Sequence, residues 1–500
     1  MSQPTSPHDT YTSPLAARNA SPEMCKIWSP RHKFTTWRKI WLAVAQAQQA
    51  CGLDITDQQI NEMKANLEVT DEDMTAAAKY ERELRHDVMA HVHAFGDKCP
   101  SAKGIIHLGC TSQDVVCNGD LLAIHESLRL IDMKIDRCIY ALGDTASKYR
   151  SLPTLGFTHY QPAQPVTLGK RLVMYAYDLK LAEDGVFKNA FGRNPLRGMK
   201  GATGTQASFL SLFDNNTKKV DKFERKFMAN LLADKFPNEK SILLMGVHST
   251  VGQTYPRICD ANILASLASV ASVLHKIATD IRLLSNRKEI DEPFGKNQIG
   301  SSAMPYKRNP MKCERICGLT RFVMNLVGNA YDTAATQWLE RTLDDSSNRR
   351  LSLPEAFLAL DGALDLMHTV ASGLVVNEAM VRKNLMLELP FMATENILME
   401  AVKAGGDRQD LHEKIRVHSQ EAGHRVKQEG LDNDLIDRLK ADPDFAPIHH
   451  MLTEDQILNP MNFVGRSVEQ TERFLKEVVE PLKERYKDEL NSLGSADRGV

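Results

Sequence analysis

The stretch ILASLASVASVLHKIATDIRLL, residues 263–284, decides the fold class of this 500-residue chain. Its large apolar residues recur at steps of three and four, at Ile263, Leu267, Val270, Leu274, Ile277, Ile281 and Leu284. This spacing is that of a helix with one apolar face, and the alanines between those residues allow a second helix to approach closely. The stretch predicts a bundle helix of more than about thirty residues, well beyond the mean length in globular domains.

Other parts of the chain show the same helical spacing. Residues 120–142 carry a long apolar stripe, and residues 35–51 place two tryptophans on one face before Gly52 ends the helix. Further helices are expected at 56–67, 73–95 and 321–340. Beyond about Val376 the helices shorten and become more charged, which predicts a smaller C-terminal helical unit. The pattern favours an all-α fold with an elongated central bundle, whose broad apolar faces suit burial against identical subunits.

The composition excludes several classes of protein. With 42% hydrophobic and 25% charged residues, the chain has the composition of a globular protein of about two to four structural units. Its net charge of −2 provides no basic field that would attract nucleic acid or an anionic membrane. No uninterrupted run of about 18 apolar residues occurs, so no membrane span is expected. Any anionic ligand must therefore meet locally clustered cations.

The cysteines and histidines do not form a metal-site pattern. The nine cysteines are odd in number and scattered, which is typical of reduced thiols in a cytoplasmic protein. Cys313 and Cys317 lie four residues apart, but no second pair at zinc-site spacing accompanies them. His86, His91 and His93 are spaced by five and two residues, so no pair shares a helix face as a helical zinc site requires. We expect no metal.

The sequence also lacks a nucleotide-cofactor motif and a secretion signal. The glycines of residues 198–204 are not followed by Gly-Lys-Ser/Thr and open no strand–helix unit, so no cofactor is expected. Residues 1–14 are rich in Ser, Thr and Pro without the apolar core of a signal peptide, which indicates a disordered leader.

Residues 300–310, Gly-Ser-Ser-Ala-Met-Pro-Tyr-Lys-Arg-Asn-Pro, form a short polar segment unsuited to a helix or a strand. Its glycine permits unusual backbone geometry, its prolines stiffen the path, and Lys307 with Arg308 places cations beside the hydroxyls of Ser301 and Ser302. Such a loop could grip a carboxylate while holding a serine close to the bond being broken. The alternative is a solvated surface loop that only connects two helices.

Three further segments are candidates for anion contacts, each with a simpler alternative. Arg85-His86-Asp87 could contact an anion or could be ordinary surface and packing residues. Thr111 or Ser112 could cap the following helix, a role compatible with anion binding at its N-terminus. The charged run from Arg341 to Arg350 could bind an anion or could be a solvated, salt-bridged helix junction.

The run from Gly300 to Pro310, followed by Met311-Lys312 and Glu314, resembles the signature of the fumarase/aspartase superfamily of lyases in its adenylosuccinate lyase form. The resemblance extends from about Tyr11 to Val479. It includes Ser-Pro-Leu at Ser13, Arg85 to His91, Thr158-His159-Tyr160-Gln161-Pro162-Ala163-Gln164, Lys200-Gly201-Ala202-Thr203-Gly204-Thr205-Gln206 and Arg341-Thr342-Leu343-Asp344-Asp345-Ser346.

The resemblance implies an all-α homotetramer of three-part subunits, with a central bundle pooled into a core of about twenty helices. It divides the chain into an N-terminal helical domain (1–111), a central bundle (112–376) containing the signature loop 289–312, and a C-terminal helical domain (377–500). It also implies active sites that are each assembled from three subunits.

The implied reaction is elimination of fumarate from adenylosuccinate, giving AMP, and from succinylaminoimidazole carboxamide ribotide in purine synthesis. By resemblance Ser301 is the general base and His159 the general acid. The carboxylate grip is Lys307 with Asn309, and Glu314 orients or charges the histidine. A serine hydroxyl is weakly acidic, so the loop cations and backbone donors must stabilise its alkoxide.

The resemblance carries over a further set of substrate contacts. They are Arg18, Arg85, His86, Asp87, Thr111, Ser112, Thr158, Gln253, Arg315, Arg341, Ser346 and Arg350. Arginine suits such anions because its planar fork binds them in a bidentate manner. Asn19 departs from the family pattern, which has a tyrosine after the arginine, so a phenol contact to the ligand is missing.

Two rival interpretations stand beside this one. The chain could be another lyase of the superfamily, acting on argininosuccinate, fumarate or aspartate. The Tyr306-Lys307-Arg308 variant and the cations of residues 341–350 favour a phosphorylated nucleotide substrate instead. The chain could also be a non-catalytic structural descendant of such a lyase, against which the retention of Ser301, His159 and Lys307 argues.

Overall fold

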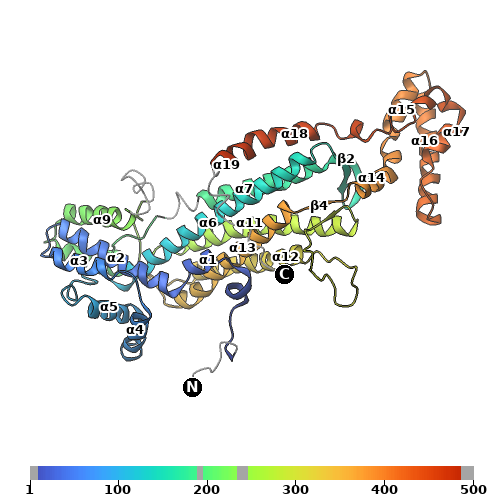
Figure 1. The fold of residues 1–500 in the computed structure, drawn as a ribbon. Coiled ribbons are helices and arrows are strands. Elements are labelled where there is room, and N and C mark those ends of the chain that lie inside the picture. The colour runs from blue at the N-terminus through green and yellow to red at the C-terminus, as the bar shows by residue number, and fades with distance from the viewer. Residues whose placement is uncertain (1–8, 189–194, 234–245, 486–500) are drawn as a thin grey trace. The chain divides into compact units, whose positions relative to one another are not determined.

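The computed structural model describes residues 9–188, 195–233 and 246–485 of the chain (Figure 1). The first eight residues of the expected leader lie outside this described part. The regular structure of the described residues is mainly helical, with two small sheets, as predicted. The α-helices are α1 (Pro22–Ile27), α2 (Pro30–Ala50), α3 (Asp57–Ala65), α4 (Asp71–Leu84), α5 (Asp87–Lys98), α6 (Ser112–Lys148), α7 (Leu168–Lys188), α8 (Ala207–Leu212), α9 (Thr217–Leu232), α11 (Ile258–Asn286), α12 (Met311–Ala335), α13 (Asp344–Ser372), α14 (Glu378–Met392), α15 (Thr394–Lys403), α16 (Arg408–His424), α17 (Leu435–Ala441), α18 (Ser467–Phe474) and α19 (Glu480–Arg485).

The remaining regular structure consists of short helical turns and two small antiparallel sheets. The π-helical turns are η2 (Leu15–Asn19), η5 (Arg425–Glu429) and η8 (Leu475–Val479), and the 3₁₀ turns are η4 (Ala202–Gly204), η6 (Pro443–Met451) and η7 (Pro460–Phe463). The strands are β1 (Pro153–Thr158) paired with β2 (Gln161–Thr167), and β3 (Ile290–Asp291) paired with β4 (Val375–Val376).

The chain forms two compact units, each assembled from three segments. The first unit comprises Met1–Ile135, Leu181–His275 and Gly318–Asp365, and the second comprises Asp136–Lys180, Lys276–Cys317 and Leu366–Val500. The five long helices α6, α7, α11, α12 and α13 each contribute residues to both units. The division into domains at 111/112 and 376/377 stays a prediction.

Helix α11 confirms the apolar stripe of the opening stretch. All seven stripe residues are buried, at 5% relative exposure or less. The helix has 29 residues, slightly fewer than predicted. By length and composition alone it is apolar enough to cross a membrane, although serine, threonine and a few charges interrupt its apolar run. The buried stripe identifies it as a core helix.

Helix α2 begins earlier than its apolar spacing predicts. Ser29 caps it by accepting a hydrogen bond from the amide of His32 at 3.2 Å, and Pro30 occupies the first turn, where the missing N–H costs nothing. Trp37 and Trp41 are buried at the centre of the apolar core of the first unit, to which α5, α6 and α9 also contribute.

The expected helix over residues 73–95 is two helices, so that prediction is wrong at its centre. Helix α4 ends where Arg85 adopts a left-handed conformation with φ 56°. His86 is extended, and its Nδ1 caps α5 by accepting from the amide of Met89 at 3.4 Å. The expected helix over 321–340 is likewise shifted, because α12 begins at Met311 and ends at Ala335.

Strands β1 and β2 form a hairpin with a two-residue turn. Thr158 pairs with Gln161, which leaves His159 and Tyr160 as the turn, at φ 52° and 58°. Such turns favour left-handed backbone at both positions, which glycine and asparagine adopt most easily. A histidine and a tyrosine here are strained, and strain of this kind concentrates at functional sites.

Candidate active site

In the first unit, predicted substrate contacts meet at the N-terminal ends of three helices. His86 and Asp87 begin α5, Ser112 begins α6, and Arg350 lies in the second turn of α13. The Ser112 hydroxyl lies 3.3 Å from His86 Nε2, and the guanidinium of Arg350 lies 3.0 Å from the carboxylate of Asp87. Helix N-termini present free N–H groups and a positive dipole end, so this group is suited to anions.

Gln253 is held at both ends of its side chain. Its Nε2 donates to Thr111 Oγ1 at 3.0 Å, and its Oε1 accepts from the amide of Thr203 at 2.6 Å. The backbone N–H of Gln253 donates to the carbonyl of Glu340 at 3.1 Å. The loop before α11 is thereby joined to the start of α6 and to the glycine-rich loop around η4.

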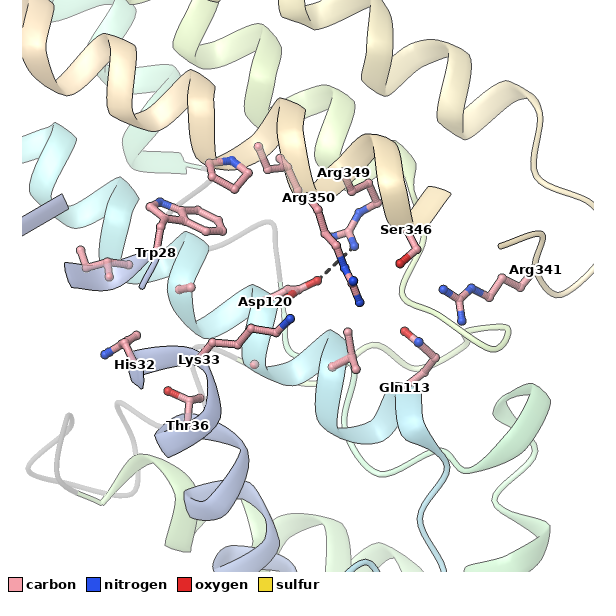
Figure 2. A pocket seen from close by; sticks show the side chains of 16 residues that line it. Trp28, His32, Lys33, Thr36, Gln113, Asp120, Arg341, Ser346, Arg349 and Arg350 are labelled. Atoms are coloured by element: carbon pink, nitrogen blue, oxygen red, sulfur yellow. Dashed lines mark hydrogen bonds and ion pairs between the residues drawn. The ribbon is translucent and has the colours of Figure 1, made fainter. Parts of the chain in front are cut away.

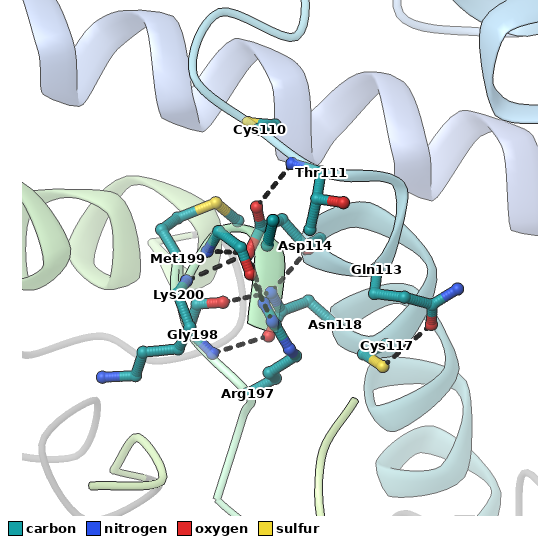
Figure 3. A network of polar contacts seen from close by, with 12 residues as sticks. Cys110, Thr111, Gln113, Asp114, Cys117, Asn118, Arg197, Gly198, Met199 and Lys200 are labelled. Atoms are coloured by element: carbon teal, nitrogen blue, oxygen red, sulfur yellow. Dashed lines mark hydrogen bonds and ion pairs between the residues drawn. The ribbon is translucent and has the colours of Figure 1, made fainter. Parts of the chain in front are cut away.

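A buried carboxylate, that of Asp114, organises these loops (Figure 3). It accepts hydrogen bonds from the amides of Thr111 (2.8 Å), Lys200 (3.0 Å) and Gly201 (3.0 Å), and it forms an ion pair with Arg197. Burial raises the pKa of Asp114, while Arg197 and the three amides oppose that shift. Because all four partners are donors, the network binds the ionised carboxylate.

Sequence reasoning missed Asp114 and Arg197. The available signal was the Thr-x-x-Asp spacing from Thr111 to Asp114, which resembles a helix capping box. The Arg197 partnership had no local signal. Asn118 strengthens the same link, since its Nδ2 donates to the carbonyl of Gly198 at 3.0 Å and its Oδ1 accepts from the amide of Gly198 at 3.1 Å.

Arg341, Ser346 and Arg350 line one cavity of about 180 Å³ (Figure 2). Arg341 lies 3.1 Å from Asp345, a fully buried carboxylate that also holds Arg257 at 2.7 Å. The two arginines and the serine that were predicted as substrate contacts in the charged run thus line the same cavity. The ion pairs of Arg341 with Asp345 and of Arg350 with Asp87 also fit the alternative of a salt-bridged helix junction, so anion binding by this run stays a prediction.

Arg18 lies on η2, and none of the contacts described for the other predicted residues reaches it. Its neighbour Asn19 uses its side chain to close the turn, with Nδ2 donating to the carbonyl of Pro14 at 2.9 Å. The Asn19 carbonyl also packs closely on α13, where a Cβ at Gly362 would lie 2.5 Å from it. A tyrosine at position 19 could not make the amide contact to Pro14.

In the second unit, the signature loop folds back on itself. A Cβ at Gly300 would lie 2.1 Å from the carbonyl oxygen of Lys307, so only glycine fits there. Asn309 Nδ2 donates to the Gly300 carbonyl at 2.7 Å. Ser301 Oγ accepts from the amide of Met304 at 3.1 Å, with a longer contact of 3.4 Å from the amide of Ala303. These amides supply the backbone donors that an alkoxide at Ser301 needs.

Glu292 fixes the end of this loop and was also missed from the sequence. Its carboxylate accepts from the amides of Lys312 and Cys313 at 3.0 Å each, which caps α12. The ammonium of Lys312 in turn donates to the carbonyl of Pro293 at 3.0 Å. Glu314 lies in the first turn of α12, and Arg315 follows it.

Thr158 and His159 lie at the exposed end of the hairpin, and Lys307 and Glu314 are exposed as well. In the described chain no hydrogen bond joins His159 to Ser301 or to Glu314. The carboxylate of Glu314 lies 4.0 Å from Arg282. Within the described part of one chain, the predicted acid and base are therefore not hydrogen-bonded to each other.

The comparisons with known proteins agree with these features. The family model described as Lyase matches residues 16–325, and that described as Adenylosuccinate lyase C-terminus matches residues 390–474. The adenylosuccinate lyase of Saccharomyces cerevisiae is 47% identical over 97% of this chain and 98% of its own length. That of Schizosaccharomyces pombe is 48% identical over 94% of this chain and 95% of its own length.

Solved structures support the fold alone, because their sequences are distant. The 3-carboxy-cis,cis-muconate lactonizing enzyme from Pseudomonas putida has a TM-score of 0.76 at 24% identity, covering 95% of this chain and 99% of its own. The fumarate lyase from Mesorhizobium sp. BNC1 has a TM-score of 0.75 at 22% identity, covering 94% of this chain and 100% of its own.

The mainly helical fold and the match of residues 16–325 to the Lyase family model define the chain as a lyase. Within that class, the chain belongs to the adenylosuccinate lyase family, whose members are carbon–nitrogen lyases. The predicted family, fold class and enzyme class are thereby confirmed.

Proposed function

We propose that the chain eliminates fumarate from adenylosuccinate, giving AMP, and from succinylaminoimidazole carboxamide ribotide. The observation that carries the residue assignment is the folded signature loop, in which backbone amides point at Ser301 Oγ while Asn309 fastens the loop to Gly300. A serine placed against N–H donors is suited to carrying negative charge. No cofactor takes part in this proposal.

In the proposed reaction Ser301, as alkoxide, removes the proton from the carbon next to a succinyl carboxylate. The electron pair left on that carbon spreads into the carboxylate, which Lys307 and Asn309 bind. The C–N bond then breaks, and His159 delivers a proton to the departing nitrogen. Fumarate and the amine leave, and a proton transfer from Ser301 to His159 through solvent restores both groups.

We further propose that the working enzyme is a homotetramer in which each active site combines residues of three subunits. Within the described residues of one chain, no hydrogen bond joins His159 to Ser301 or Glu314, and this supports the proposal. Large apolar side chains exposed on the bundle helices are consistent with it, because burial against another subunit would remove them from water. These are Met174, Tyr177 and Leu181 on α7, Leu283 on α11, and Phe322 and Tyr331 on α12.

A mixing experiment tests the shared site. Ser301→Ala and His159→Ala proteins are each dissociated with mild denaturant, mixed, and allowed to reassociate. If acid and base come from different subunits, some sites in the hybrids contain both wild-type groups, so the mixture regains activity that neither variant has alone. Reassociation of each variant by itself is the matched control. A mixture as inactive as its parents would contradict the shared site.

The substrate assignment is tested by absorbance assays of the wild-type protein. Turnover of adenylosuccinate with release of fumarate is expected, whereas turnover of argininosuccinate or aspartate alone would identify another lyase of the superfamily. A cytoplasmic location belongs to the proposal, and the nine free cysteines support it because reduced thiols are typical of that compartment.

A further inference from the structure

The cavity at the start of α13 is cationic and small (Figure 2). Four of its lining side chains are cations, Lys33, Arg341, Arg349 and Arg350, and only one is a carboxylate, Asp120. Its volume of about 180 Å³ lies below the roughly 300–1,000 Å³ of pockets that enclose whole small molecules. The cavity therefore suits one anionic group of a ligand whose remainder lies outside.

The three arginines of this cavity all have carboxylate partners within the chain. Arg341 has Asp345 at 3.1 Å, Arg349 has Asp260 at 2.6 Å, and Arg350 has Asp87 at 3.0 Å. The same holds for the histidine in the wall, since His32 Nε2 lies 2.9 Å from Glu126. These pairs fix the arginine side chains and neutralise part of their charge.

Lys33 is different. Within the described residues its ammonium has no hydrogen bond and no ion pair, and its close contacts are the rings of Trp37 (5.0 Å from Nζ to the ring centroid) and Phe34 (5.3 Å). Burial and the nearby charge of Arg350 lower the pKa of Lys33, while Asp120 opposes that shift. Asp120 is itself engaged by Arg349 at 3.1 Å. Lys33 is thus a partly desolvated cation whose hydrogen-bonding capacity is unused.

We propose that Lys33 is a direct ligand of the substrate phosphate, bound in this cavity together with Arg341, Ser346 and Arg350. The inference rests on the proposed function, which supplies a substrate with one phosphate and two carboxylates. The carboxylates have their own grip in Lys307 and Asn309, so the phosphate is the anion left for this cavity. A desolvated ammonium gains most from such a ligand, because it gives up no internal partner to bind it.

The test replaces Lys33 by methionine, which keeps the length and the contact with the rings. Lys33→Met is expected to raise KM for adenylosuccinate, and Ki for AMP, by about 10- to 100-fold, as for loss of one charged hydrogen bond. kcat should stay within about threefold, because the phosphate does not react. Ki for fumarate should not change, because fumarate carries carboxylates and no phosphate.

Two controls accompany this variant. Lys39→Met removes an exposed lysine of the same helix and should leave KM and both Ki values unchanged. Lys33→Arg keeps the positive charge and should recover most of the AMP affinity. Thermal unfolding of each variant shows whether the fold is retained.

The proposal is overturned if Ki for AMP is unchanged in Lys33→Met, or if Ki for fumarate rises as much as Ki for AMP. Calorimetric titration with AMP measures the same dependence without turnover. The two proposals can fail separately. If wild type binds AMP more tightly than Lys33→Met but does not cleave adenylosuccinate, the proposed reaction is refuted and the phosphate site is retained.

Discussion

The proposed substrate-contact residues of the first unit and the proposed catalytic residues of the second are held in place in opposite ways. Contacts in the first unit span long stretches of sequence, as in Arg350 with Asp87 and Gln253 with Thr111. In the second unit the contacts of Ser301 and Asn309 stay within their own loop. Contacts between distant segments thus hold the proposed binding residues of the first unit, here called the binding half. The proposed catalytic residues of the second unit lie on a turn and a loop. Binding and catalysis should therefore respond to different changes.

The largest expected effect is on catalysis alone. Ser301→Ala and His159→Ala should each lower kcat by about 10²- to 10⁴-fold, the usual contribution of a general base or acid. Their thermal midpoints should match wild type, because neither side chain is buried. Steady-state kinetics and calorimetry measure both, with Ser302→Ala as the matched neighbour. Activity within about tenfold of wild type would refute the assigned roles.

A change in the first unit should act on stability instead. Asp114→Ala leaves Arg197 buried and unpaired and three amides without their acceptor, so the free energy of unfolding should fall by about 3–5 kcal/mol. Asp54→Ala, which removes an exposed carboxylate, should change it by no more than about 0.5 kcal/mol. Urea unfolding measures both. Equal losses in the two variants would show that the network does not hold the binding half together.

Acid should loosen the first unit through His91 on α5. Burial and the charge of Arg38 lower the pKa of His91 from 6.5 to about 4, and its ring stacks on Phe34 with centroids 3.6 Å apart. Between pH 6.5 and 4 the unfolded chain therefore carries a proton on His91 that the folded chain does not. The free energy of unfolding falls as the pH drops through this range, by about 3 kcal/mol for this group.

The measurement is urea unfolding at pH 7 and pH 4.5, followed by tryptophan fluorescence. All four tryptophans, Trp28, Trp37, Trp41 and Trp338, belong to the first unit, so the signal reports that unit. His91→Phe, which keeps an aromatic ring against Phe34, should lose the part of the pH dependence that His91 contributes. A similar part should remain, because burial also lowers the pKa of His107 in the same unit to about 4. A pH dependence as steep as in wild type would assign the acid sensitivity to other groups.

The smallest expected effect concerns the ion pair of Asp87 with Arg350. Their side chains are 29% and 58% exposed, so the pair should contribute less than about 1 kcal/mol to stability. A double-mutant cycle with Asp87→Ala and Arg350→Ala, read by urea unfolding, isolates that coupling. A coupling above about 2 kcal/mol would mean that the pair is structural and not available to a ligand.

The sequence predicted what depends on local pattern. The stripe of α11 is periodic, so its burial followed directly from the spacing. The break between α4 and α5 was missed because its signals, a left-handed arginine and a histidine cap, are unusual residues for those positions. Asp114 and Arg197 lie 83 residues apart, and the sequence around neither residue predicts that they pair. The site residues themselves came from motif resemblance, which identifies residues without giving their contacts.

The turn formed by His159 and Tyr160 has a consequence for how the protein tolerates change. Both residues hold a left-handed backbone that glycine or asparagine would adopt with less strain. A chain that lost its proposed acid to glycine or asparagine should therefore be inactive and somewhat more thermostable than wild type. Selection for stability alone, as in a laboratory screen or a consensus design, would favour removing this histidine, and only selection for turnover keeps it in place.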